Sequence, residues 1–240
     1  VTLDAPEGAL NMVSTGLEQM SHTPCVRLLG SSAQSVLARC AASTGVPFQE
    51  IPLDDETVYA ALGEAYRSGD AETPMAAACE LLGSSVNQFD TELFYAVGFT
   101  DLRGLIRFMS LGHGSGLWQD NQQSLLQSGE ICPARLITCR EDVYRYLLER
   151  GASASEAADF MECVRLGRIA RLGYSEPQRE LLKKCGAEDW FVQACKKIQY
   201  LFPECHSAEY AVSLVRLVWY ALHYPETAAI ILDERSTYRA

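Results

Sequence analysis

The sequence lacks the short motifs by which several large enzyme classes are recognised. No glycine-rich stretch ends in Gly-Lys-Ser or Gly-Lys-Thr, which excludes a P-loop phosphate site. No Gly-x-Ser-x-Gly elbow is present, which argues against a hydrolase of the α/β class. No Asp-x-Asp triplet occurs in the 240 residues, so there is no sign of the paired carboxylates that hold two metal ions for phosphoryl transfer. We therefore expect no catalytic residue, no metal ligand and no cofactor.

Metal-binding and membrane-spanning patterns are missing as well. The nine cysteines form no Cys-x-x-Cys pair, and no Cys/His set has the spacing of a zinc site. We interpret them as small buried apolar residues of a reduced, cytoplasmic protein. The longest apolar runs are too short or contain charges, so we expect no membrane contact. The first residues lack the basic start of a signal peptide, and the missing initial Met fits an excised or processed piece.

Positive charge is scarce but unevenly distributed. Lys and Arg number 20 against 31 Asp and Glu, which gives a net charge of −11 and a pI near 4.8. A free-standing nucleic-acid binder usually has the opposite balance, because neutralising phosphate charge drives its binding. Residues 138–200 hold most of the basic side chains. This segment is either a phosphate-facing surface or a solvated helical face with ordinary ion pairs.

The helix start and stop signals of the chain predict one helix after another. Thr73, Pro74 and Gly83 fit an N-cap, a first helical position and a stop. Three further starts carry a cap residue followed three positions later by Glu or Gln: Thr138 with Glu141, Ser153 with Glu156, and Ser175 with Gln178. No convincing alternating strand pattern and no Asn-Gly turn is present. We predict one all-α domain of about ten irregularly packed helices over residues 26–240, after an N-terminal extension of residues 1–25.

Pro203 is expected to interrupt the helices of the C-terminal part. A helix over residues 188–202 should precede it, and a long helix over residues 206–223 should follow it. Leu214, Leu217 and Val218 share one stripe of that second helix, and apolar residues lie on both sides of the stripe. A helix that is apolar on most sides is a buried one, so we expect it at the centre of the domain.

Two short stretches could hold a ligand on composition alone. The acidic run at residues 54–56 could bind a metal ion, but acids at a helix start more often stabilise the positive end of the helix dipole. Gly112 and Gly114 flank His113 in "SLGHGSG". Glycines there either let the backbone approach a ligand or merely turn the chain between two helices. Composition leaves both interpretations of the glycine-rich stretch open.

Four stretches form an ordered set that is more specific than any one of them. They are "VRLLGSSAQSVLARCAASTG", "SLGHGSGLWQDNQQSLLQSG", "TCREDVYRYLLERGASASEAADFMECVRLGR" and "DWFVQACKKIQYLFPECHSAEY". In this order they resemble the fingers region of bacterial DNA polymerase III alpha chains of the PolC type. The second is similar to that family's Gly-Leu-Ser-His-Gly-Thr-Asp-Val-Trp stretch, and the fourth to its Cys-Lys-Lys-Ile-Lys-Tyr-Met-Phe-Pro segment. The resemblance covers roughly residues 26–225.

The resemblance implies an all-helical fingers domain, which in this family closes over the incoming nucleotide and flanks the template and primer. The matching candidates for the triphosphate side are Gly112, His113, Gly114, Arg140, Arg165 and Arg168. Those for the nucleic-acid side are Lys196, Lys197 and His206. Arginine suits phosphate because its planar fork binds two oxygens at once. Each candidate also has an ordinary explanation: Arg140 as a helix-start residue paired with an acid, His206 as a helix N-cap, and the lysines as solvated side chains.

Three positions depart from the family pattern. Gly112 stands where the family has Ser before the His, Gly116 where it has Asp, and Glu204 where it has Lys after Phe-Pro. The last change puts an anion beside a phosphate path. The family's palm, with its metal-binding aspartates, is absent. We therefore expect a non-catalytic fingers-like domain that takes part in DNA replication, binding primed DNA or a nucleotide weakly and associating with polymerase or replisome proteins.

Other interpretations remain open on sequence alone. The first alternative is a helical interaction module that kept the fold and lost its nucleic-acid contacts. A second is an unrelated enzyme with a pocket at residues 112–115. The origin is also open, because the chain can be excised from a longer polymerase or be a divergent relative that stands alone.

Overall fold

The computed structural model describes residues 32–84 and 86–239. This part of the chain contains helices and no β-strand. The α-helices are α1 (Ser32–Thr44), α2 (Glu56–Ser68), α3 (Pro74–Leu81), α4 (Gln88–Val97), α5 (Leu102–His113), α6 (Gln123–Gln127), α7 (Arg140–Leu148), α8 (Ala154–Arg165), α9 (Arg168–Leu172), α10 (Glu176–Lys184), α11 (Asp189–Lys197), α12 (Glu204–His223) and α13 (Thr227–Arg239). Three short helical turns are η2 (Phe48–Glu50), η3 (Trp118–Gln122) and η4 (Pro133–Arg135). The predicted all-α fold is confirmed, whereas the predicted extension at residues 1–25 lies outside the described residues.

Several helix starts lie where the sequence placed them. The Thr73 side chain accepts a hydrogen bond from the Ala76 amide at 3.1 Å, directly before Pro74 opens α3. Ser153 caps α8 through a reciprocal pair, in which its amide donates to Glu156 at 2.8 Å and its hydroxyl accepts from the Glu156 amide at 3.3 Å. Each such cap satisfies amides that the first turn of a helix leaves without a partner.

The start of α7 differs from the expected pairing by one residue. Cys139 is the N-cap, and Asp142 rather than Glu141 closes the capping box. The Asp142 carboxylate accepts from the Thr138 amide and hydroxyl, both at 2.7 Å, and from the Cys139 amide at 3.1 Å. A shorter acid can reach back over this tight turn, which leaves Glu141 free to contact another segment.

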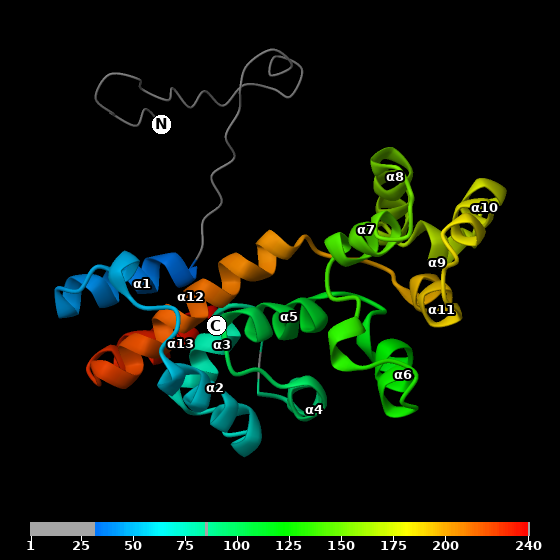
Figure 1. Cartoon of the computed structure of the whole chain (residues 1–240). Coiled ribbons are helices and arrows are strands. Elements are labelled where there is room, and N and C mark those ends of the chain that lie inside the picture. Colours follow the sequence, from blue (N-terminus) through cyan, green and yellow to red (C-terminus); the bar gives the residue numbers. More distant parts are fainter. Residues whose placement is uncertain (1–31, 85, 240) are drawn as a thin grey trace, which may run out of the picture. The chain divides into compact units, whose positions relative to one another are not determined.

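Helix α12 is the central element of the described chain. It packs against α1, α2, α3, α5 and α13, and Figure 1 shows it passing beside α5. Leu214, Leu217 and Val218 are fully buried, as the apolar stripe predicts. The helix begins at Glu204, directly after Pro203, so the expected interruption at this proline is also present. Burying each such side chain contributes about 1.5–3 kcal/mol to stability.

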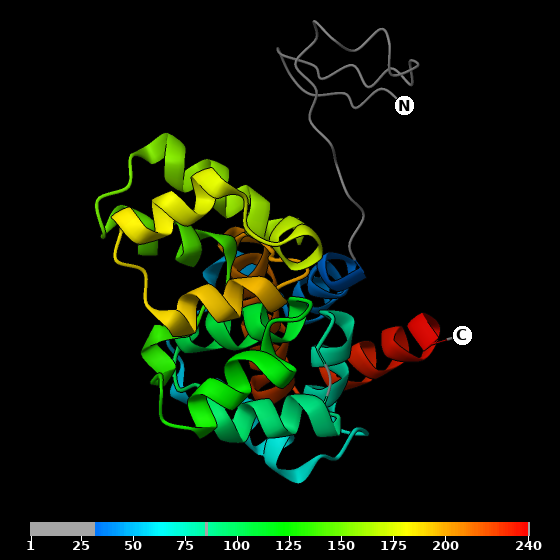
Figure 2. The same cartoon turned by 90° about the vertical axis from the view of Figure 1, so that its right-hand side faces the viewer.

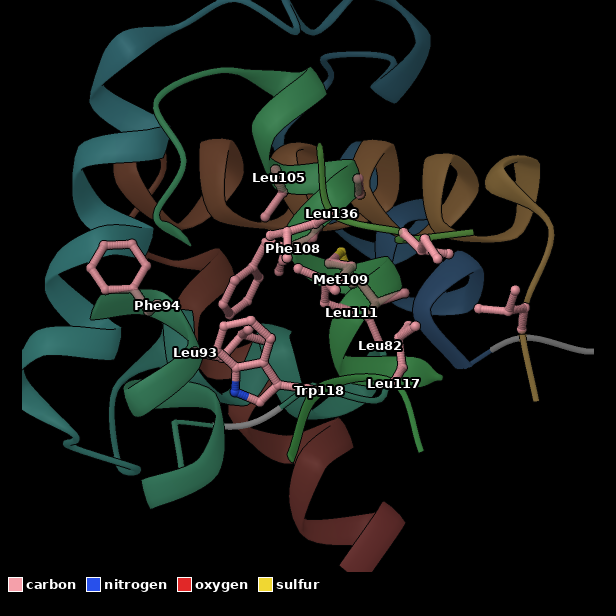
Figure 3. Close-up of a cluster of buried hydrophobic side chains, with 14 of the residues drawn as sticks. Leu82, Leu93, Phe94, Leu105, Phe108, Met109, Leu111, Leu117, Trp118 and Leu136 are labelled. Carbon is pink, nitrogen blue, oxygen red and sulfur yellow. The ribbon is translucent and has the colours of Figure 1, made fainter. Parts of the chain in front are cut away.

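A dense apolar cluster lies beneath α5. Phe108 points from α5 toward Phe94 and Trp118 in Figure 3, and its ring centroid lies 4.9 Å from that of Tyr66. The further labelled members of the cluster are Leu82, Leu93, Leu105, Met109, Leu111, Leu117 and Leu136. This cluster fixes the end of α5, and with it the glycine-rich stretch that follows.

The described residues form thirteen α-helices instead of about ten, and two glycine breaks in the C-terminal half account for one of the additional helices, α9. Gly167 and Gly173 have positive φ angles of 63° and 74°, and they separate the short α9 from its neighbours. The helix expected over residues 188–202 ends at Lys197, because Ile198 adopts an extended backbone with ψ of 121°. Residues 198–203, which we call the linker, are therefore extended. Figures 1 and 2 show α7 to α11 gathered at one end of the described helices.

Candidate functional site

The linker brings three distant stretches of the sequence to one place. The Ser115 amide donates to the Tyr200 carbonyl at 3.1 Å, and the Gln199 amide donates to the Ser115 carbonyl at 2.8 Å. On its other side, the Leu201 amide donates to the Arg165 carbonyl at 3.1 Å. The Arg140 amide donates to the Phe202 carbonyl at 3.1 Å. The backbone of the linker thus takes its partners from the glycine-rich stretch, the start of α7 and the end of α8 instead of from a helix.

Two glycines permit this close approach of backbone to backbone. Gly116 has φ of 66°, and a side chain there would overlap the Lys197 carbonyl oxygen. Gly167 has φ of 63°, and a side chain there would overlap the Gln199 carbonyl oxygen. Positive φ is unfavourable for residues other than glycine. Both positions therefore require glycine for two reasons, the backbone conformation and the lack of space for a side chain. The departure from Asp at Gly116 therefore has a structural reason, while Gly167 was not singled out from the sequence.

Two buried amide side chains donate hydrogen bonds to backbone carbonyls in and around the glycine-rich stretch. Asn121 donates to the Gly116 carbonyl at 2.8 Å and to the Ala194 carbonyl at 3.1 Å. Gln122 is fully buried and donates to the Ile137 carbonyl at 2.6 Å. Such contacts satisfy carbonyl groups that the irregular backbone would otherwise leave without partners. No sequence signal distinguished these two amides from surface polar residues.

Three arginines lie beside the linker: the Arg140 amide and the Arg165 carbonyl bond to its backbone, and Arg168 directly follows Gly167, which lies against Gln199. Arg165 binds Glu162 with two hydrogen bonds of 2.8 and 2.9 Å, and its third nitrogen lies 3.4 Å from the Tyr200 hydroxyl. The hydrogen bond from Arg165 holds the pKa of the Glu162 carboxyl below its ordinary value, and the charges of Arg165, Arg140 and Arg168 add to this effect. We call Arg140, Arg165 and Arg168 the arginine cluster.

The members of the arginine cluster differ in whether their guanidinium group already forms an ion pair. Arg140 pairs with Glu141 at 2.9 Å, and Arg165 with Glu162. Arg168 is exposed and has no ion pair or hydrogen bond to another described side chain. The three guanidinium groups and two carboxylates leave a local charge of about +1, in a protein of net charge −11.

The two candidate histidines pack against each other. The ring centroids of His113 and His206 lie 5.6 Å apart, and His206 also stacks on Phe202 at 4.6 Å. Tyr210 lies 5.5 Å from His113 and 4.5 Å from His206. Burial lowers the pKa of both histidines. They are therefore neutral aromatic packing groups at pH 7 and add no positive charge to the site.

The remaining candidates point to other partners. The Lys197 ammonium donates to the Asp120 carbonyl, and the Lys196 ammonium lies 5.7 Å from the centre of the Tyr174 ring. Glu204 pairs with Arg145 at 3.3 Å, and its amide donates to Glu141 at 2.8 Å. The structure thus brings together the residues around 112–116, the arginine cluster and both histidines. Lys197 lies against this group through its carbonyl beside Gly116, whereas the Lys196 side chain points to Tyr174.

The described residues offer little for covalent or metal chemistry. Within residues 32–84 and 86–239, no three His, Cys, Asp or Glu side chains gather to hold a metal ion. The acidic run at residues 54–56 starts a helix, where the Asp55 carboxylate accepts from the Thr57 amide at 2.9 Å. Burial raises the pKa of the Cys79 thiol to about 12, so it is protonated at neutral pH. Among the described helices, none is long and apolar enough to cross a membrane.

Comparison with known proteins identifies the relatives. The chain is 28% identical over 201 residues, 83% of its length, to DNA polymerase III PolC-type of Caldanaerobacter subterraneus subsp. tengcongensis. It is 30% identical over 203 residues to the protein of the same name from Oceanobacillus iheyensis, and 37% identical over 125 residues to that of Mycoplasma genitalium. This chain is a relative of PolC-type DNA polymerase III. The predicted resemblance is thereby confirmed.

The relationship concerns only a part of each polymerase. The aligned region is 83% of this chain but only 14% of the Caldanaerobacter protein, and 52% of this chain but 8% of the Mycoplasma protein. No protein-family model matches the chain. The sequence similarity alone therefore does not assign the activity of a whole PolC-type polymerase to this chain.

Proposed function

We propose that residues 26–240 are a fingers-like domain without polymerase activity of its own, which binds phosphate groups of primed DNA or of a nucleotide at the arginine cluster. The relationship to PolC-type DNA polymerase III supports a role in DNA replication. The observation that carries the proposal is the position of Arg140, Arg165 and Arg168 beside the linker, whose backbone bonds to the Arg140 amide and the Arg165 carbonyl. These arginines come from separate helices and meet beside the linker.

The chemistry of the cluster suits a phosphate that arrives from solvent. A guanidinium group presents a planar fork that matches two phosphate oxygens. Arg165 uses this geometry on Glu162, whose side chain is 39% exposed. Because this pair has two hydrogen bonds and Arg165 is only 20% exposed, a phosphate has to compete with Glu162 for the Arg165 fork. Arg168 supplies a charge with no such competitor.

The binding is expected to be weak and sensitive to salt. Glu141, Glu162 and Glu204 all lie close to the cluster or to the start of α12, and the whole chain is strongly acidic. Repulsion from these charges opposes the approach of DNA. Because binding would come from the release of counterions, its strength should fall steeply as salt rises. We therefore expect the protein to act in the cytoplasm, together with polymerase or replisome proteins.

A titration of fluorescently labelled primed DNA, followed by anisotropy, tests the proposal. The variant Arg165→Gln/Arg168→Gln should bind on the order of tenfold more weakly than the wild type near 50 mM salt. The control Arg39→Gln/Arg67→Gln removes the same charge from exposed ion pairs on α1 and α2, and it should bind like the wild type. Equal loss in both variants would show that only net charge matters, and the proposal would be wrong.

The alternative function is a helical interaction module that no longer binds DNA. The ion pair between Arg145 and Glu204 favours it, because Glu204 places an anion where the family motif has a lysine after Phe-Pro. The neutral histidine pair points the same way. This module would show no binding of primed DNA at low salt in the same titration.

A further inference from the structure

A groove of about 520 Å³ lies beside Tyr174, away from the contacts of the arginine cluster. Its lining residues are Tyr174, Arg179, Leu182, Lys183, Gly186, Ala187, Val192 and Lys196. They come from α10, from α11 and from the loops before and after α10. We call this the Tyr174 groove. Leu182 and Tyr174 are buried and make its floor, whereas its three charged residues are exposed.

The charge of the Tyr174 groove is unusual for this protein. Arg179, Lys183 and Lys196 line it, and no acidic residue does. The Lys183 ammonium has no ion pair or hydrogen bond to another described side chain, and the Arg179 guanidinium forms an ion pair only with the exposed Glu176, at 3.0 Å. The Lys196 ammonium lies 5.7 Å from the centre of the Tyr174 ring, a cation–π contact, and it donates a long hydrogen bond of 3.5 Å to Gln193. The groove thus presents three cations and no lining acid, on a chain of net charge −11.

The opposite side of α10 has the reverse character. A second groove there, of about 490 Å³, is lined by Glu156, Asp159 and Glu180, with Lys184 as its one cation. Lys184 is held by Glu156 at 3.0 Å. Helix α10 thus separates an acidic surface from a basic one, and the neighbouring residues Lys183 and Lys184 belong to different grooves.

We infer that the Tyr174 groove binds the backbone phosphates of a single nucleic-acid strand, as a contact additional to the arginine cluster. Only the choice of a nucleic acid as ligand rests on the proposed function. The ammonium groups are point charges without a preferred oxygen pattern, which suits successive phosphates of any sequence. Tyr174 does not offer a free ring for a base, because it stacks on Phe160 at 6.0 Å and its hydroxyl donates to the Val192 carbonyl at 2.7 Å.

The spacing of the two sites favours a strand over a small ligand. Helix α9 begins at Arg168 of the arginine cluster and ends two residues before Tyr174. Its five residues span about 7.5 Å, which a strand covers within a few nucleotides. Arg171 is exposed on the same helix, and no ion pair or hydrogen bond joins it to another described side chain. Helix α9 also packs against α11, which carries Lys196. One strand can therefore contact both sites at once.

Binding of labelled oligo-dT to the full chain, measured against salt, tests this inference. The variant Arg179→Gln/Lys183→Gln should lose about 1.4 from the slope of log K against log salt, because each lost contact to a single strand removes about 0.7. The control Lys184→Gln/Arg67→Gln removes the same charge, including the neighbouring lysine on the acidic side of α10, and should keep the wild-type slope. A slope equal to that of the control would overturn the inference.

The same titration separates this inference from the proposed function. If Arg165→Gln/Arg168→Gln weakens binding and the Arg179→Gln/Lys183→Gln variant does not, the inference fails and the proposed function stands. If only the Arg179→Gln/Lys183→Gln variant weakens binding, the groove stands and the arginine cluster fails. Poly-glutamate is the competing probe: if it binds as tightly as oligo-dT and depends on Lys183, the groove takes acidic peptides and the assignment to a nucleic acid is wrong.

Discussion

The Arg145 guanidinium lies 3.3 Å from the Glu204 carboxylate, at the turn where α12 begins. Arg145 also binds Asp142 at 2.8 Å, so one cation serves two acids from α7 and α12. The acid at position 204 therefore has a local structural partner. Half of the Arg145 side chain remains exposed, at 51%, and its charge is partly cancelled where a phosphate would otherwise meet it.

The substitution Glu204→Lys should strengthen binding of primed DNA. It removes an anion near the arginine cluster, releases Arg145 and adds a cation, so we expect an affinity gain of about threefold to tenfold at low salt. The control Glu64→Lys reverses an exposed acid that pairs with Arg67 on α2, far from this turn in sequence, and should change affinity much less. If the wild type binds and Glu204→Lys leaves its affinity unchanged, the turn does not lie on a phosphate path.

The purified chain should not extend a primed template. Phosphoryl transfer by polymerases needs carboxylates that hold two metal ions, and the sequence has no Asp-x-Asp triplet. Primer-extension gels with Mg²⁺ and with Mn²⁺ check this. Nucleotide incorporation that persists through repeated purification would contradict the non-catalytic assignment.

Substituting the glycines beside the linker should destabilise the protein strongly. Gly116→Ala and Gly167→Ala combine a positive φ with overlap of a carbonyl oxygen, so we expect a loss of about 2–4 kcal/mol in the free energy of unfolding. Urea denaturation measures this loss. Gly129→Ala is the matched control, because Gly129 has φ of 75° but open space around it, and about 1 kcal/mol is expected there. Equal losses at all three sites would show that the linker does not lie against these glycines.

Truncating a buried side chain of α12 should lower the free energy of unfolding far more than truncating an exposed one. Leu217 is fully buried, so Leu217→Ala should lower the free energy of unfolding by about 2–5 kcal/mol. Leu172 is 84% exposed, and Leu172→Ala should stay within about 0.5 kcal/mol of the wild type. Comparable effects from the two substitutions would mean that α12 is not the central helix.

Asp142 should make stability depend on pH. Burial alone would raise the pKa of its carboxyl, but hydrogen bonds from Thr138, Arg145 and Cys139 outweigh burial and hold that pKa below its ordinary value. A carboxyl with a lowered folded pKa stabilises the protein above its unfolded pKa of about 3.9, and this contribution is lost as pH falls through the folded pKa. Asp142→Asn should therefore cost about 1–3 kcal/mol at pH 7. The difference in the free energy of unfolding between the variant and the wild type should become smaller below about pH 4. A difference that stays constant with pH would contradict this role of Asp142.

The all-helical fold, the long central helix and two of the three capping boxes follow from local sequence signals. The capping boxes of Ser153 and Ser175 could be predicted because each cap residue and its partner are only three residues apart in the chain. The linker could not be predicted in this way. Its extended backbone is stabilised by Ser115, Arg140 and Arg165, which lie far from it in sequence, and local propensity favoured a continued helix. Contacts between distant segments override such propensities.

The candidate site was predictable only in part. The ordered motifs led to the arginine cluster and to residues 112–116, which the structure brings together. They did not reveal that His113 and His206 are packing partners, because spatial contact between two distant rings leaves no local pattern. The sequence also did not predict the Tyr174 groove. Its three cations come from two helices, α10 and α11, and in the sequence they look like scattered surface charges.

The salt dependence of primed-DNA binding by the wild type and by Arg165→Gln/Arg168→Gln tests the central claim most directly. Each phosphate contact contributes about 0.9 to the slope of log K against log salt on duplex DNA, so the slopes should differ by about 1.8 between roughly 50 and 200 mM salt. A wild type that binds with the same slope as the variant, or that does not bind at the lowest salt, would contradict a phosphate-binding arginine cluster.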